Sequence, residues 1–203
     1  MRLPEQVRSM LRTASMAVQP RMQFRCDIFN PAWNTFVCEW APVVHVFVEQ
    51  ALGPYDTPPR PDIMFVDDGM HAWGANASFE PGSGQVRLSS VVENNPGMTL
   101  EKLTHEFIHA SLAGWPEGDP FYEEGVVDFS TWVLAHAPVW GEHRNAMIAS
   151  AANNIRIRRD RAMLDKSDYD RKRWAGGLLA MLTKGPHIIT VFRLKKMEND
   201  RTW

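Results

Sequence analysis

In this 203-residue chain, the stretch that indicates most about fold and chemistry is His105-Glu106-Phe107-Ile108-His109. Histidines four residues apart lie on one face of an α-helix, so His105 and His109 would present both imidazoles to one point, with Glu106 beside it. An H-E-x-x-H run on a helix has the geometry of a zinc site with an adjacent general base. The same pattern arises by chance in about one chain of this length in a hundred, so a helix and a third ligand are needed.

The sequence around this run favours a helix. Thr99 is the expected N-cap, and Gly114 is the expected end. Apolar residues between them recur at helical spacing: Leu100, Leu103, Phe107 and Ala110. We therefore expect a helix whose apolar stripe faces the core.

The third metal ligand is expected downstream of this helix. Leu112 and Trp115 occupy the positions at which metzincins have a glycine and their third ligand, so that class of zinc enzyme is excluded. The segment from Phe121 to Ala135 predicts a second helix that can fold back against the first, and Glu124 near its start is the best candidate ligand.

Asp128 supports the choice of Glu124 over its neighbour Glu123. It follows Glu124 by four residues on the same helical face, where it can accept the second ring N–H of His105. Glu123 lies about 100° away on the helix, so only one of the two glutamates can face the metal. A solvated acidic helix start is the simpler explanation for these carboxylates, but it does not explain Asp128 within an apolar segment.

These residues together resemble the gluzincin branch of the zinc metallopeptidases, which includes thermolysin-like, aminopeptidase-N-like and compact peptidase MA-like domains. The similarity covers residues 74 to 135. It implies an α+β, zincin-like fold with a small mixed sheet, an active-site helix and a C-terminal helical subdomain. It also implies particular roles: His105, His109 and Glu124 bind Zn²⁺, Glu106 is the general base, and Asp128 supports a ligand.

The resemblance extends to substrate binding. Gluzincins pair the substrate backbone with the free edge of a strand beside the active-site helix, and the small residues Ala75, Asn76 and Ala77 suit such a strand. An ordinary hairpin with small side chains explains them equally well. Where aminopeptidase-like members place an oxyanion-stabilising tyrosine, this chain has Trp174, so Tyr169 and His187 are the nearby candidates for a catalytic donor.

The expected function is that of a zinc-dependent metallopeptidase in which Glu106 assists the attack of water on a peptide or protein substrate. One alternative is a zincin-fold amide hydrolase or tailoring enzyme that acts on a specific small molecule or biosynthetic peptide. Another is a module that binds zinc without turnover. The presence of Glu106 argues against the second alternative, because a structural zinc site does not need a base.

Length and composition set further limits. A chain of 203 residues suits one compact domain, with the sheet and active-site helix in residues 1–114 and a helical part in 115–203. The net charge of -2 gives no reason to expect nucleic-acid or membrane partners. Cys26 and Cys38 do not form a disulfide framework, and the N-terminal residues do not resemble a signal peptide, so we expect a cytoplasmic protein. The oligomeric state stays open.

The remaining elements follow from periodicity and turn residues. Strands are expected at 21–28, 62–67, 73–79 and 85–92, with a hairpin turn at 81–84. Helices are expected within 1–20, from 31 to 52 with a kink or division at Pro42, from 142 to 164, and from 169 to 182.

Overall fold

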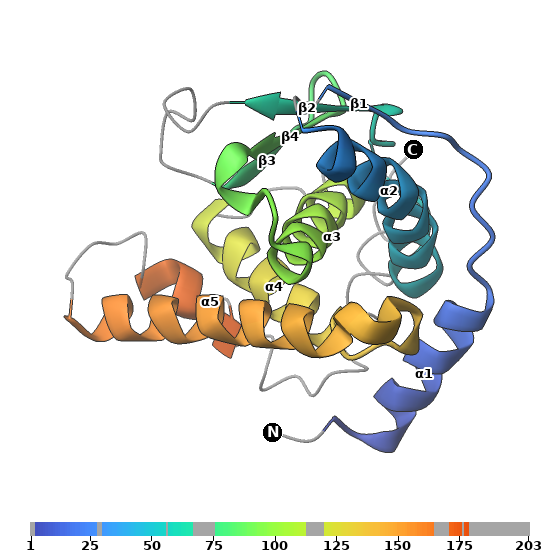
Figure 1. Ribbon diagram of the computed structural model, residues 1–203. Coiled ribbons are helices and arrows are strands. Elements are labelled where there is room, and N and C mark those ends of the chain that lie inside the picture. Colours follow the sequence, from blue (N-terminus) through green and yellow to red (C-terminus); the bar gives the residue numbers. More distant parts are fainter. Residues whose placement is uncertain are drawn as a thin grey trace, which may run out of the picture.

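The computed structural model of the chain describes residues 3–27, 30–55, 57–66, 76–112, 120–164, 171–175 and 177–178. These residues form an α+β fold, as the sequence predicts, with a small mixed sheet lying along helices α2 and α3 (Figure 1). The helices are α1 (Glu5–Met16), α2 (Pro31–Leu52), α3 (Pro96–Leu112), α4 (Pro120–Leu134) and α5 (Arg144–Leu164), with short 3-10 helices η2 (Ser90–Val92) and η3 (Pro138–His143). Residues 171–175 and 177–178 are also helical and are called the Arg173 segment below.

The sheet has the strand order β1-β2-β4-β3, in which β1 (Arg25–Asp27), β2 (Asp62–Val66) and β4 (Gln85–Ser89) are parallel. β3 (Ala77–Glu80) is antiparallel to β4 and joins it through the predicted turn at 81–84. In β2, Ile63 is buried and its neighbour Met64 is 41% exposed, because successive side chains of a strand point to opposite faces of the sheet. The buried face covers the helices, and α3 packs against β3.

Helix α2 has the limits expected from its sequence. The side chain of Asn30 accepts hydrogen bonds from the backbone N–H groups of Ala32 and Trp33, and Pro31 stands at the first helical position. Gly53 ends the helix with a φ of 100°, a conformation that favours glycine. Pro42 lies inside one continuous helix, so the expected division at this residue does not occur.

Helix α3 begins earlier than the sequence analysis expects. It starts at Pro96, and the side chain of Asn95 accepts a hydrogen bond from the N–H of Met98. The prediction that Thr99 is the N-cap is therefore wrong. The Thr99 hydroxyl instead donates to the carbonyl of Val92 and is buried inside the fold. Asn95-Pro96 was the true start signal, since proline is favoured at the first helical position after a capping residue.

Helix α3 occupies the centre of the fold, where α2, α4, α5 and the sheet surround it (Figure 1). All four residues of the predicted apolar stripe are fully buried: Leu100, Leu103, Phe107 and Ala110. His105 and Glu106 are also buried, at 5% and 3% exposure. Polar groups in such a helix need specific partners, because burying them without any costs free energy.

The other predicted elements are present with changed lengths. Strand β4 ends at Ser89 instead of continuing to residue 92, because the Ser89 side chain accepts a hydrogen bond from the N–H of Val91 and starts η2. β1 covers only three residues of the expected 21–28. The predicted helix stop at Gly114 lies outside the described residues. In the described part of the chain, none of the helices combines the length and apolar character needed to cross a bilayer.

Candidate metal centre

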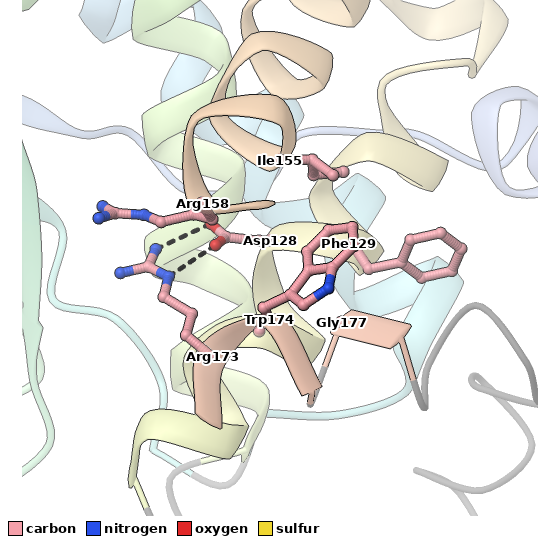
Figure 2. Close-up of a pocket in the computed structure, with 8 residues that line it drawn as sticks. Asp128, Phe129, Ile155, Arg158, Arg173, Trp174 and Gly177 are labelled. Carbon is pink, nitrogen blue, oxygen red and sulfur yellow. Dashed lines mark hydrogen bonds and ion pairs between the residues drawn. The ribbon is translucent and has the colours of Figure 1, made fainter. Parts of the chain in front are cut away.

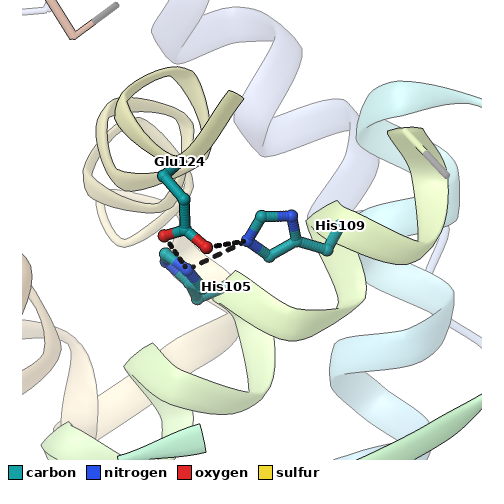
Figure 3. A group of neighbouring side chains, drawn as sticks. All are labelled: His105, His109 and Glu124. Carbon is teal, nitrogen blue, oxygen red and sulfur yellow. Dashed lines mark hydrogen bonds and ion pairs between the residues drawn. The ribbon is translucent and has the colours of Figure 1, made fainter. Parts of the chain in front are cut away.

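The two histidines and Glu124 converge as the sequence predicts. His105 and His109 extend from neighbouring turns of α3, and Glu124 reaches toward them from α4 (Figure 3). The Nε2 atoms of the two histidines are 3.2 Å apart. Glu124 Oε1 lies 3.2 Å from Nε2 of His109, and Oε2 lies 3.5 Å from Nε2 of His105. Three donors from two helices therefore surround one point.

These separations fit a tetrahedral metal ion. Zinc binds histidine nitrogen and carboxylate oxygen at about 2.0–2.2 Å, so two ligand atoms at the corners of a tetrahedron are about 3.3–3.6 Å apart. The Nε2–Nε2 separation of 3.2 Å and the 3.2 Å from Glu124 Oε1 to His109 Nε2 are close to that value, and the second oxygen of Glu124, Oε2, lies 3.5 Å from His105 Nε2. Two imidazoles and one carboxylate also form an accepted donor set for catalytic zinc, with the fourth corner left for water or substrate.

Both histidines have a carboxylate beside the ring nitrogen that faces away from this point. His109 Nδ1 lies 2.9 Å from Glu123 Oε1, in hydrogen-bonding geometry. His105 Nδ1 lies 3.4 Å from Asp128 Oδ1, an ion-pair distance without a formed hydrogen bond. Asp128 thus stands at the predicted place, with a longer contact than expected. The role of Glu123 as the partner of His109 was missed, although the need of each ligating histidine for an outer acceptor pointed to it.

The protonation of the two rings then creates a need for positive charge. A neutral imidazole carries one N–H, and a carboxylate beside Nδ1 favours that proton on Nδ1. When both rings are neutral and carry that proton on Nδ1, the Nε2 atoms of His105 and His109 hold lone pairs that face each other and the oxygens of Glu124 at 3.2–3.5 Å. Electron pairs held this closely repel unless a cation or a proton lies between them.

The pKa values in the cluster reflect the same shortage of positive charge. Burial alone would lower the pKa of His109, but its hydrogen bonds to Glu123 and Glu124 raise it well above its ordinary value. Burial would raise the pKa of Glu124, but hydrogen bonds with the two histidines hold it well below its ordinary value. Without a metal, a proton on His109 would balance the carboxylates. A divalent cation would do so more completely.

Glu106 lies next to His105 in α3 and is buried with it. Burial raises the pKa of its carboxyl above the ordinary value, and the nearby histidines and Lys102 oppose that shift. A carboxylate with a raised pKa in a water-poor site takes up a proton readily and can release it again. This is the property needed in a general base that later acts as an acid.

Arg173 is the site residue that the sequence analysis missed. Its side chain is buried, and it donates through Nε and Nη2 to the two oxygens of Asp128, at 2.7 and 2.9 Å (Figure 2). Nη2 also lies 2.9 Å from Glu124 Oε2. The excess of carboxylates in the site indicated that a cation was required, but no local pattern distinguishes Arg173 from its neighbours Arg171 and Lys172.

The remaining predicted site residues are placed only in part. Tyr169, His187 and Ala75 lie outside the described residues. Asn76 and Ala77 lie at the start of β3, the edge strand that packs against α3. The carbonyl of Asn76 accepts a hydrogen bond from the N–H of Ser89, so these residues lie next to β4.

Trp174 lines a small pocket between α4, α5 and the Arg173 segment, together with Phe129, Ile155 and Asp128 (Figure 2). Trp174 and Asp128 thus line the same pocket. A tryptophan ring has no hydroxyl with which to stabilise an oxyanion in the way that a tyrosine does.

Comparisons with protein-family models, with curated proteins and with solved structures found no match to this chain.

Proposed function

We propose that this protein is a metal-dependent hydrolase of the zincin type that cleaves peptide or related amide bonds, with Zn²⁺ as its cofactor. The observation that carries the proposal is the arrangement of His105, His109 and Glu124 around one point, with the buried Glu106 next to His105 in α3. A chance H-E-x-x-H run would not be expected to have outer carboxylates beside both Nδ1 atoms.

Zinc bound by these three side chains would act as a Lewis acid that makes water a better nucleophile and polarises the carbonyl of the scissile bond. Glu106 then has two tasks. Its carboxylate accepts a proton from the attacking water, and its carboxyl group returns that proton to the leaving nitrogen as the C–N bond breaks. The raised pKa of Glu106 suits both directions of transfer.

The substrate backbone is proposed to lie along β3. This strand is at the edge of the sheet, runs antiparallel to β4, and packs against the helix that carries the metal ligands. An extended peptide could add to its outer edge through backbone hydrogen bonds, which would bring a peptide carbonyl close to α3. Asn76 and Ala77 would then contact the substrate, together with Ala75.

A second candidate is a hydrolase or tailoring enzyme that acts on one small molecule or biosynthetic peptide. Trp174 in the pocket beside Asp128 favours it, because a tryptophan there has no hydroxyl of the kind that stabilises the oxyanion in aminopeptidase-like enzymes. Digestion of a peptide library tests this directly. Bound zinc without cleavage of any peptide would favour the second candidate.

The proposal is tested with the full chain and the Glu106→Gln variant, with Glu142→Gln as a matched control because the Glu142 side chain is 89% exposed. We expect one equivalent of zinc by elemental analysis in all three proteins. Turnover in Glu106→Gln should fall about a hundredfold or more, while the control keeps the wild-type rate. The proposal fails if Glu106→Gln cleaves as fast as wild type. It also fails if the wild-type chain does not retain zinc, or if elemental analysis finds iron instead, which the same donor set can bind.

A further inference from the structure

We propose that Arg173 is a positioning residue of the metal centre, which holds Glu124 in place as a one-oxygen ligand while it fixes Asp128 beside His105. This inference rests on the metal site proposed above. It adds a third chain segment, distant in sequence, to the two helices that supply the ligands.

The contacts of Arg173 are specific to a guanidinium group. Nε and Nη2 form two parallel hydrogen bonds with Asp128, at 2.7 and 2.9 Å, and Nη2 is shared with Glu124 Oε2 at 2.9 Å. An arginine presents its donors in a planar fork that fits a carboxylate in this way, whereas a lysine offers one ammonium on a flexible chain. The Arg173 side chain is 8% exposed, so its bonds form largely away from water.

Glu124 needs such a partner because packing alone does not hold it. Its side chain is 29% exposed, compared with 7% for Asp128. Oε2 pairs with Arg173 and lies 3.5 Å from Nε2 of His105, whereas Oε1 lies 3.2 Å from Nε2 of His109. By occupying Oε2, the guanidinium leaves Oε1 as the oxygen available to a metal and reduces the tendency of Glu124 to bind it through both oxygens.

The backbone of α4 is shaped to receive this segment. Gly125 directly follows the candidate ligand Glu124, and a Cβ atom placed on it would lie 1.9 Å from the carbonyl oxygen of Arg173 and 2.7 Å from the backbone nitrogen of Gly177. Any side chain at position 125 would push the two backbones apart. The absence of a side chain at Gly125 therefore lets the Arg173 segment come close enough for its guanidinium to reach both carboxylates.

The test compares zinc affinity and the visible spectrum of the cobalt(II)-loaded protein in wild type, Arg173→Lys and the control Arg161→Lys, which changes an exposed arginine of α5. Lysine keeps the positive charge, so the change isolates the fork. We expect about a tenfold loss of zinc affinity in Arg173→Lys, as for other partners of metal ligands. The cobalt spectrum should weaken toward that of a five-coordinate ion, because the released Oε2 can join Oε1 on the metal. The control should match wild type in both measurements.

Gly125→Ala provides an independent variant that leaves every polar group of the site unchanged. We expect it to lower zinc affinity at least as much as Arg173→Lys, while Gly82→Ala, at a position with open space around it, has no effect. Circular dichroism checks folding, and if one site variant does not fold, the other decides. Wild-type affinity and an unchanged cobalt spectrum in the folded variant would overturn the role of Arg173. Absence of zinc binding in the wild-type chain would instead overturn the metal site itself.

Discussion

His45 shows how much the surroundings of a single residue matter in this protein. Its ring lies in the core between the rings of Phe24, Tyr55 and Phe107, at centroid distances of 5.8, 4.7 and 5.9 Å. Among the described residues, neither ring nitrogen has a hydrogen-bond partner. Burial lowers the pKa of His45, and the nearby charge of Glu49 opposes this only in part. The ring is therefore held neutral inside the fold, in contact with Phe107 of the helix that carries the candidate metal ligands.

This residue makes the stability of the protein depend on pH. In the unfolded chain a histidine has a pKa of about 6.5, whereas the folded pKa of His45 is lower. Above about pH 6.5 His45 is neutral in both the folded and the unfolded chain, and its full contribution to stability is present. As the pH falls from there through the folded pKa, the unfolded chain binds a proton before the folded chain does, so this contribution is lost.

The free energy of unfolding of His45→Leu should therefore fall less than that of wild type when the pH is lowered from about 7 to about 5. Urea denaturation at each pH measures it. The control Phe36→Leu changes a half-buried aromatic residue that does not titrate, and it should keep the wild-type slope. Parallel curves for wild type and His45→Leu would show that His45 is not the source of the effect.

At the scale of elements, the candidate metal centre depends on how α3 packs against α4 and α5. The closest approach described between α3 and α5 is at Gly97, in the first turn of α3. A Cβ atom on Gly97 would lie 2.6 Å from Cβ of Ala146 and 2.7 Å from its carbonyl carbon. The two helices can approach this closely because position 97 has no side chain. Further along the same interface, Ser150 of α5 donates a hydrogen bond to the buried Glu101 at 3.5 Å.

Gly97→Ala should lower the free energy of unfolding by about 1–3 kcal/mol, because one methyl group forces a close-packed interface apart. The better helix propensity of alanine offsets part of this cost, at most about 1 kcal/mol. Gly82→Ala serves as the matched control, since nothing lies within 4 Å of the added atom, and its effect should stay within about 0.5 kcal/mol. Equal stability of both variants in urea denaturation would contradict the close packing of α3 on α5.

At the scale of the whole molecule, the proposed metal site connects distant parts of the chain. Its donors come from α3 and α4, and Arg173 joins them from a segment 45 residues beyond Asp128. An ion that bridges separate elements binds the folded chain and has no comparable site in the unfolded one. Binding is therefore expected to stabilise the fold as a whole.

Zinc at a hundredfold excess over its dissociation constant should stabilise the folded state by about 2.7 kcal/mol and raise the melting temperature, and a chelator should reverse the change. In Glu124→Gln most of this shift should be lost, because a neutral amide replaces the charged ligand. Glu142→Gln should behave as wild type, since its side chain is exposed. A melting temperature that does not respond to zinc or chelator in the wild-type chain would contradict a metal site between these helices.

The sequence by itself determined the features that depend on short-range periodicity. The spacing of His105 and His109 places both rings on one face of any helix that contains them, whatever surrounds it. The same reasoning paired Glu124 with Asp128, and the Asn30-Pro31 and Gly53 signals set the limits of α2. Such features could be predicted because the geometry of a helix and of its caps is set by residues within one or two turns.

Only the tertiary structure decided which distant groups meet. It placed Glu123 on His109 while Glu124 faces the ligand point, since this depends on the angle at which α4 crosses α3. It also brought Arg173 to both carboxylates through the close contact at Gly125. Contacts between residues far apart in sequence depend on how whole elements pack. Neighbouring residues of the same charge have similar local sequence, so the sequence does not show which of them reaches a distant carboxylate. The periodicity of the sequence therefore indicated the ligands, whereas packing selected the residues that hold them in place.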